Sequence, residues 1–183
     1  MTRRISIVAC FFALAMTAAA QSARAPEYEV KAAFLYNFAK FVDWPSRAFP
    51  DSSTPLRICV LGRDPFGDTL SRVVQGKSIS GRPIISRTVP SSAEARQCHI
   101  LFIGSSDPAF LRQALAPLHN LPVLTVGESN EFLPLDGMIN FVLEQDRVRF
   151  EVNLAAAERH HLKLSSKLLA VARVVNVGGG ETN

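Results

Sequence analysis

Histidine side chains are the first candidates for metal or acid–base chemistry, because imidazole is a common metal ligand and titrates near neutral pH. Two of the four histidines, His160 and His161, are adjacent in the run Glu158-Arg-His-His. The pair lacks the H-x-x-x-H spacing that places two imidazoles on one helix face. Adjacent helical residues point about 100° apart, so we expect this pair not to share a metal ion. His99 follows Cys98 in an apolar run, and we expect it to pack inside the fold or at an edge.

Two glycine-containing loops resemble anion-binding turns in composition. The segment 62–67, Gly-Arg-Asp-Pro-Phe-Gly, has two glycines spaced as in a phosphate-binding loop, but Asp68 stands where such a loop has lysine. The segment 104–107, Gly-Ser-Ser-Asp, is polar and could bind a small anion through backbone N–H groups. We interpret both as the starts of helices, because each carries an aspartate followed by proline, which favours a helix N-cap and first turn.

Nucleophilic catalysis has no support in this chain. It lacks the G-x-S-x-G turn of many hydrolases, and its carboxylates show no close pair in an acid–base pattern. We therefore predict no catalytic residue, no metal site and no cofactor, and we predict that the protein is not an enzyme.

Basic side chains gather in the C-terminal part of the chain. Arg159, His161, Lys163 and Arg173 lie there, and Arg47 would join them if the two ends of the chain pack together. Two interpretations remain open. These residues form a solvated basic face, or four of them line a pocket for a small anionic ligand: Arg47, Arg159, His161 and Arg173.

The N-terminal residues have the composition of a secretory signal peptide. Arg3 and Arg4 precede the apolar run 5–20, which ends in three alanines with an A-x-A cleavage pattern. This pattern predicts that residues 1–20 are removed and that the mature chain is periplasmic. The loss of Arg3 and Arg4 lowers the formal net charge from +4 to +2. Because no Lys/Arg run with interleaved aromatic residues is present, we expect no nucleic-acid partner.

Cleavage leaves two cysteines, Cys59 and Cys98, in the mature chain. In an oxidising compartment they favour a disulfide, which would close a loop of about 40 residues and stabilise the fold by ~4 kcal/mol in the chain-entropy model. However, strands aligned at Gly62 and Gly104 would offset the cysteines by about 10 Å, beyond the roughly 7 Å limit between Cα atoms. A staggered register or a bend before His99 would remove this difficulty. A disulfide and two buried reduced cysteines both remain open.

Strands and helices alternate along most of the chain. Apolar runs predict strands at 56–61, 83–89, 99–103 and 123–126, and a hairpin at 138–143 and 148–152. The segments between and after them predict helices at 64–74, 91–96, 107–118, 154–161 and 165–175. This order predicts a single-domain α/β fold with a mainly parallel Rossmann-like sheet, helices on both faces and an antiparallel edge hairpin. We expect residues 26–177 to form this domain and residues 178–183 to be a flexible tail.

The segment 26–45, PEYEVKAAFLYNFAKFVDWP, predicts an amphipathic helix that packs on the core. Pro26 suits the first helical turn, and Trp44-Pro45 ends the helix because the residue before proline is pushed out of the α region. The apolar residues with helical spacing are Val30, Phe34, Phe38, Phe41 and Val42.

The run KAAFLYNFAKFVDWP within this helix closely resembles the N-terminal signature of the YfiR family of small periplasmic proteins. The segment 150–175, FEVNLAAAERHHLKLSSKLLAVARVV, resembles the family's C-terminal signature, and ICVLG, DPFG and CHILFIGSS match in order between them. The resemblance thus covers nearly all of the predicted mature chain. Members carry cysteines at positions matching Cys59 and Cys98, which favours the disulfide. Some relatives have a second cysteine pair nearer the C-terminus that this chain lacks, so redox switching through such a pair has no basis here.

The resemblance implies a periplasmic repressor that binds the sensory region of an inner-membrane diguanylate cyclase. Such a protein would lower cyclic-di-GMP and biofilm formation, and an outer-membrane lipoprotein would relieve the repression. We also expect a homodimer. Candidate partner contacts, which are alternatively core residues, are Phe34, Phe38, Phe41, Trp44, Leu168 and Leu169. The alternative function is a periplasmic module that binds a small anion or another small molecule.

Overall fold

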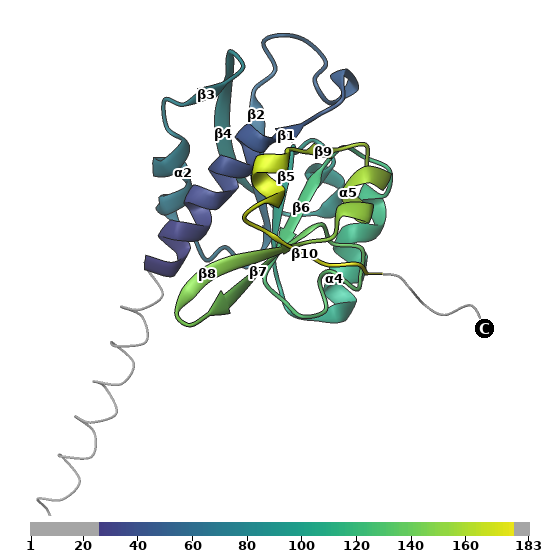
Figure 1. Cartoon of the computed structure of the whole chain (residues 1–183). Coiled ribbons are helices and arrows are strands. Elements are labelled where there is room, and N and C mark those ends of the chain that lie inside the picture. Colours follow the sequence, from purple (N-terminus) through teal and green to yellow (C-terminus); the bar gives the residue numbers. More distant parts are fainter. Residues whose placement is uncertain (1–25, 178–183) are drawn as a thin grey trace, which may run out of the picture.

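An eight-stranded sheet organises the chain. In the computed structural model, which describes residues 26–177, its strand order is β10-β8-β7-β6-β5-β2-β4-β3 (Figure 1). Neighbouring strands run parallel except in the β3–β4 and β7–β8 pairs. The predicted leader, 1–20, and tail, 178–183, lie outside the described residues. The strands are β2 (Leu56–Gly62), β3 (Ser78–Ile79), β4 (Arg82–Val89), β5 (Ile100–Gly104), β6 (Leu124–Gly127), β7 (Ile139–Glu144), β8 (Arg147–Val152) and β10 (Arg173–Val174).

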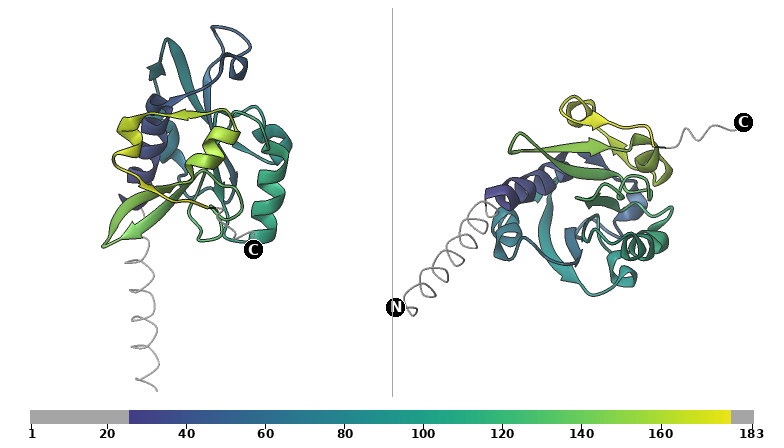
Figure 2. Two further views of the ribbon diagram at one scale, coloured as in Figure 1. Left: turned by 45° about the vertical axis from the view of Figure 1, so that its right-hand side comes forward. Right: turned by 90° about the horizontal axis from the view of Figure 1, so that it is seen from below.

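Helices cover both faces of this sheet, which confirms the predicted α/β class (Figure 2). Along β2, Ile58 and Val60 enter the core that holds the first helix, whereas Cys59 and Leu61 enter the core that holds α3 and α4. In the described part of the chain, no helix combines the length and apolar character needed to cross a bilayer. The helices are the first helix (residues 26–41), η1 (Ser46–Ala48), α2 (Asp68–Val74), α3 (Ser92–Ala95), α4 (Pro108–Leu115), η2 (Ala116–Leu118), α5 (Leu154–Arg159) and α6 (Ser166–Leu169).

Side-chain hydrogen bonds cap helices α4 and α5, and the first of these caps confirms the prediction for Asp107. The carboxylate of Asp107 accepts from the backbone N–H of Ala109 at 3.0 Å, at the start of α4. The amide oxygen of Asn153 accepts from the N–H of Ala156 at 3.1 Å, at the start of α5. Each side chain satisfies a donor that the first helical turn leaves without a backbone partner.

The predicted start of the helix at 64–74 is wrong. The helix, α2, begins at Asp68, and its N-cap is Gly67 with a φ of +51°. Because that angle lies outside the right-handed helical region, the preceding residues cannot continue the helix backwards. The carboxylate of Asp64 instead accepts from the N–H of Phe66 at 2.8 Å and forms a turn ahead of the helix.

The last predicted helix, 165–175, is also shorter than expected. Helix α6 ends at Leu169, and β10 then pairs in parallel with β8, with Val174 opposite Val152. The N–H of Val175 donates to the carbonyl of Val152 at 2.8 Å. The outer edge of β8 would otherwise leave backbone groups unpaired, so strand pairing overrides the local helical pattern.

The first helix ends at residue 41 rather than at Trp44. Residues Val42–Asp43 form β1, which pairs antiparallel with β9 (Lys163–Leu164) in a separate two-stranded sheet. The N–H of Ser165 also donates to the carbonyl of Phe41 at 2.9 Å. The N-terminal helix and the C-terminal segment are therefore joined directly.

Candidate functional site

A polar crevice lies at the carboxyl ends of β2 and β5. The chain leaves β2 toward β4 on one side and returns to β5 on the other, so these ends form the topological switch point where open α/β sheets bind ligands. A cavity of about 610 Å³ opens there. Loops after β2, β5 and β6 and the start of the first helix line it, with Tyr28, Lys31, Arg63, Ser105, Asp107 and Glu128.

Two glycines allow the strand ends to approach each other at this crevice. Gly62 and Gly104 are paired in register, and the N–H of Arg63 donates to the carbonyl of Gly104 at 3.0 Å. A Cβ atom at position 104 would lie 1.8 Å from the carbonyl oxygen of Arg63, so no other residue fits without a backbone shift. The loop 104–107 forms the predicted turn, in which the hydroxyl of Ser105 accepts from the N–H of Asp107 at 3.1 Å.

Lys31 is the most unusual residue of the crevice. Its side chain is only 6% exposed, yet its ammonium group donates to Glu27 and, at 2.7 Å, to Oε2 of Glu128. The hydroxyl of Tyr28 donates to Oε1 of Glu128 at 3.0 Å, and the ammonium lies 4.5 Å from the centre of the Tyr28 ring. A buried cation requires such compensation, and here it comes from two carboxylates and an aromatic face.

The predicted apolar face of the first helix is partly wrong, because Lys31 is buried where Val30 was expected to be. Val30, predicted to be part of that face, is 44% exposed, while Lys31, Leu35 and Phe38 are buried. The face is rotated because the ammonium pairs with Glu27 one turn earlier and with Glu128 after β6. The i, i+4 spacing of Glu27 and Lys31 was visible in the sequence, but their third partner lies far away in the chain.

The walls of the crevice are charged and polar. Glu27, Glu128, Lys31 and Arg63 bring charges of both signs to its walls, and Ser105 adds a hydroxyl. Among the described residues that line it, none is a cysteine or histidine, so no serine there has an imidazole base. The site can hold a small polar molecule through hydrogen bonds and ion pairs.

The four basic residues singled out by the sequence occupy different elements. Arg159 pairs with Asp136, and Arg173 pairs with Glu144 at 2.9 Å and with Glu151. The hydrogen bond from Arg173 to Glu151, together with the charge of that carboxylate, raises the pKa of the guanidinium. Arg47 is exposed in η1, and His161 is exposed after α5. Two of the four bases are thus neutralised by separate carboxylates, and an anion pocket built from them stays a prediction.

The structure contains a disulfide between Cys59 and Cys98, with Cα atoms 6.0 Å apart. The strands are aligned at Gly62 and Gly104, as assumed, but Cys98 lies before the strand, which starts at Ile100. The bend at His99 therefore brings the sulfur atoms together, which was one of the two solutions open from the sequence. Both cysteines are buried in the core beneath α3 and α4.

His99 links the start of β5 to the loop after the first helix. Its Nδ1 accepts from the N–H of Arg57 at 3.0 Å, and its Nε2 lies 3.1 Å from the carbonyl of Ala48, to which it donates in the neutral ring. The imidazole stacks on Phe49 with ring centres 4.3 Å apart. Burial lowers the pKa of His99 to about 4, and the charges of Arg57 and Arg82 contribute further. His99 is therefore neutral at physiological pH.

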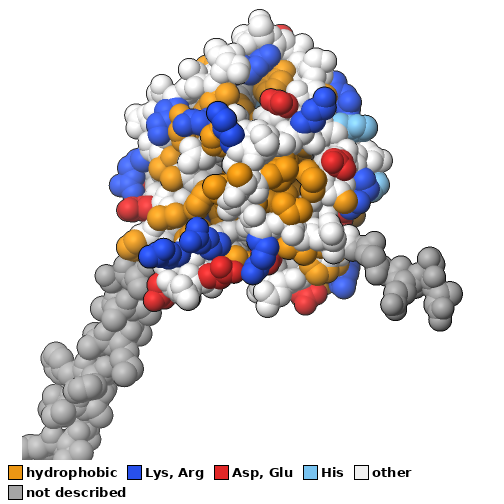
Figure 3. Space-filling model, viewed as in Figure 1, with side chains coloured by type: hydrophobic (Ala, Val, Ile, Leu, Met, Phe, Trp, Pro, Cys, Tyr) orange, Lys and Arg blue, Asp and Glu red, His pale blue; other side chains and the backbone are white. Residues whose placement is uncertain are grey.

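The predicted partner contacts divide by burial. Phe38 and Leu168 lie in the core, so they shape the surface without reaching it, whereas four are half-buried: Phe34, Phe41, Trp44 and Leu169. Sequence reasoning missed Leu143, which is 56% exposed on the β7–β8 hairpin. Figure 3 shows hydrophobic side chains reaching this face of the molecule among lysines and arginines.

An apolar groove of about 620 Å³ runs between the start of the first helix and the hairpin. Val30, Phe34, Leu143 and Val148 supply its apolar walls. Arginines on the hairpin lie at its rim, at positions 147 and 149. We call this surface the helix–hairpin groove. Two acidic residues, Glu27 and Asp146, also line it. The groove thus combines exposed apolar area with charges of both signs, which is the composition of a protein-binding surface.

Comparison with known protein families gives one match that spans most of the chain. A family described as YfiR/HmsC-like matches residues 28–173, from the first helix to β10. Its proteins are periplasmic and regulatory rather than catalytic, and they act in diguanylate cyclase signalling. The match includes the run KAAFLYNFAKFVDWP and all but the last two residues of the segment 150–175. The chain belongs to the YfiR/HmsC-like family.

Proposed function

We propose that this protein binds the sensory region of an inner-membrane diguanylate cyclase from the periplasm and represses it. The observation that supports this proposal is the family match over residues 28–173, which includes the first helix and the hairpin. Repression would lower cyclic-di-GMP and biofilm formation, and an outer-membrane lipoprotein that competes for the protein would relieve it.

The helix–hairpin groove is the surface we assign to the cyclase. Val30 and Leu143 are 44% and 56% exposed and lie beside the half-buried ring of Phe34. Repression requires that the protein bind the inactive conformation of the cyclase more tightly than the active one. Apolar contacts from these residues would supply affinity, and Arg147 and Arg149 would select an acidic surface on the partner.

The first test is recovery of the mature, oxidised protein from its own cell envelope with whatever binds it. Identification of an inner-membrane protein with a diguanylate cyclase domain is the expected result. Recovery of no such protein under gentle solubilisation would reject the proposal. The periplasmic region of the recovered cyclase then allows direct affinity measurements.

A pair of variants tests the assigned surface. Leu143→Glu places a charge in the groove, and we expect it to weaken cyclase binding at least about tenfold. Ile85→Glu is the matched control, because Ile85 is 40% exposed on β4, on the other side of β2 and β5 from the hairpin. Equal affinities of the two variants would show that the groove is not the contact. Thermal unfolding of both confirms that each remains folded.

A second candidate function, binding of a small polar molecule, is favoured by the crevice around Lys31. A buried ammonium held by two carboxylates at a topological switch point is a pre-organised polar site. A library of small metabolites should contain compounds that raise the melting temperature of the wild-type protein but not of Lys31→Met. A ligand whose effect is lost in Arg173→Ala instead would point to the basic C-terminal residues.

A further inference from the structure

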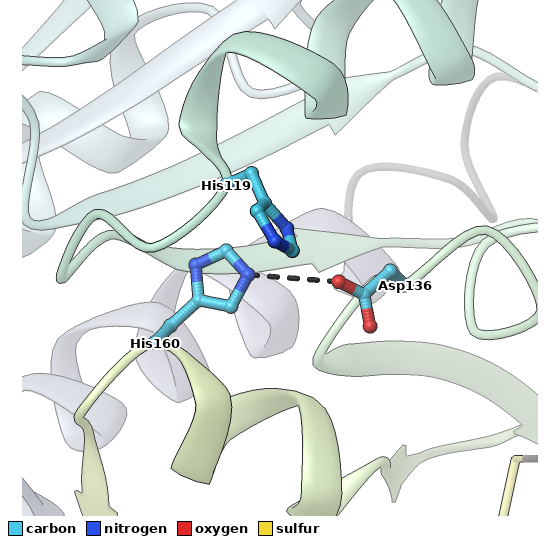
Figure 4. A group of neighbouring side chains, drawn as sticks. All are labelled: His119, Asp136 and His160. Atoms are coloured by element: carbon cyan, nitrogen blue, oxygen red, sulfur yellow. Dashed lines mark ion pairs between the residues drawn. The ribbon is translucent and has the colours of Figure 1, made fainter.

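Three potential metal ligands converge from segments that are far apart in the sequence and that sequence reasoning did not connect. His119 follows η2, Asp136 lies in the turn before β7, and His160 follows α5. Figure 4 shows the three side chains pointing toward a common centre. One ligand atom from each lies within 4.8 Å of the others, beside a cavity of about 500 Å³.

His160 is held as a metal-binding histidine is held. Its ring is buried, and Nδ1 lies 2.9 Å from the carbonyl of Leu121, so that nitrogen carries the proton. In the neutral ring the lone pair is then on Nε2, which is buried and has no hydrogen-bond partner. A backbone carbonyl that fixes the tautomer in this way is the usual outer partner of a ligating imidazole. The unpartnered Nε2 faces the carboxylate of Asp136 at 3.6 Å.

Asp136 is fixed from the other side. Arg159 donates to its Oδ1, which leaves Oδ2 directed at His160. The backbone of Asp136 has a φ of +73°, a left-handed conformation that aspartate tolerates better than most residues. Arg159 is therefore a positioning residue for the carboxylate rather than a free base for an anion.

His119 is the third residue of the group, and its side chain is the one that is free to change rotamer. It is exposed, and its ring centre lies 5.8 Å from that of His160. Tetrahedral ligands about 2.0 Å from zinc lie ~3.3 Å apart, so the group must contract by roughly 1 Å or more. Rotation of the exposed His119 side chain can provide this movement without disturbing the core.

Contrary to the expectation of no metal site from the sequence, we propose that His119, Asp136 and His160 form a zinc-binding site. Two imidazoles and one carboxylate supply three ligands, and water or an anion takes the fourth position, as in other open zinc sites. Arg112 lines the same cavity and favours an anion there. Bound zinc would cross-link η2, the turn before β7 and the end of α5. The inference does not depend on the proposed function.

Titration of tag-free, disulfide-intact mature protein with ZnCl₂ by calorimetry tests the site. We expect saturable binding of one ion per chain and a rise in melting temperature with zinc concentration. His119→Gln should weaken binding at least about tenfold, and because His119 is exposed the variant should fold normally. Asp136→Asn should act in the same direction, since asparagine accepts the left-handed backbone.

The matched control is His161→Asn, which removes the adjacent exposed histidine and keeps the positive φ of 61° at that position accessible. Its zinc affinity should equal that of the wild type. Co²⁺ should give the intense visible absorption of a tetrahedral site in the wild type and lose it in His119→Gln. Absence of saturable zinc binding, or unchanged binding in both His119→Gln and Asp136→Asn, would overturn the proposal. None of these measurements involves a cyclase, so this inference and the proposed function can fail separately.

Discussion

The two faces of the sheet are stabilised by different means. On the side of the first helix, Phe34, Phe38, Phe141 and Phe150 form an aromatic cluster with ring centres 5.1 to 6.0 Å apart. On the side of α3 and α4, the core is mostly aliphatic and contains the Cys59–Cys98 disulfide. One face therefore depends on the packing of large rings, and the other on smaller side chains with a covalent cross-link.

This difference also separates the surfaces above the two cores. Among the described residues, four of the five exposed large hydrophobic side chains belong to the first helix, the β7–β8 hairpin or the C-terminal segment: Val30, Leu143, Val171 and Val174. The fifth is Ile85 on β4. Exposed apolar side chains thus lie at the surface next to the aromatic core, where a partner can cover them. The disulfide side supports the sheet, and the aromatic side is the one suited to binding.

The largest expected effect comes from removing a ring at the centre of the aromatic cluster. Phe38→Ala should lower the free energy of unfolding by about 4 kcal/mol, because Phe38 is fully buried and leaves a cavity. Phe34→Ala is the control, since Phe34 belongs to the same cluster but is half-buried, and it should cost about half as much. Urea unfolding measures both. Equal losses would show that the difference in burial between Phe38 and Phe34 does not determine their contributions to stability.

Removal of the disulfide should have the next largest effect. The double variant Cys59→Ala/Cys98→Ala should be less stable by about 3 kcal/mol under oxidising conditions, because the unfolded chain gains the freedom of a loop that the bond closes. The wild type in reducing agent should show a similar loss. If the double variant matched the oxidised wild type in stability, the cross-link would not be what supports the aliphatic face.

A smaller effect is expected from the protonation of His99, beside the disulfide. The imidazole has a pKa of about 4 in the folded protein against an ordinary value of 6.5, so between these values the unfolded chain binds more protons. Stability therefore falls as the pH is lowered through this range, with a His99-dependent loss of about 2 kcal/mol between pH 7 and pH 4. His99→Asn should show a correspondingly weaker pH dependence in urea unfolding. An unchanged profile would exclude His99 as the cause.

Local signals in the sequence were sufficient for much of the fold. Asp107 followed by Pro108 identified the start of α4, because capping depends on residues within one turn. The apolar runs located the central strands, and the alternation of strands and helices indicated a mainly parallel sheet. The disulfide between Cys59 and Cys98 was favoured by the predicted oxidising compartment and by the family resemblance, although two reduced cysteines remained open.

Features that depend on distant partners could not be read in this way. The burial of Lys31 requires Glu128, which follows β6, and the conversion of the last predicted helix into β10 requires the free edge of β8. His119, Asp136 and His160 come together only because the fold places the end of η2, the turn before β7 and the end of α5 side by side. Short-range spacing carries no information about such contacts, which explains why the fold was more predictable than the candidate sites.

The pairing of β1 with β9 has a consequence for how the chain folds. Val42 lies opposite Leu164, so the N-terminal helix completes its backbone contacts only when nearly the whole chain is present. Contacts between residues so far apart in sequence slow folding, because a long loop must close before any energy is gained. We expect a chain that is still being synthesised to remain without its native structure until its last segment arrives. For a chain exported as the sequence predicts, this delay would keep the polypeptide extended while it passes through the membrane.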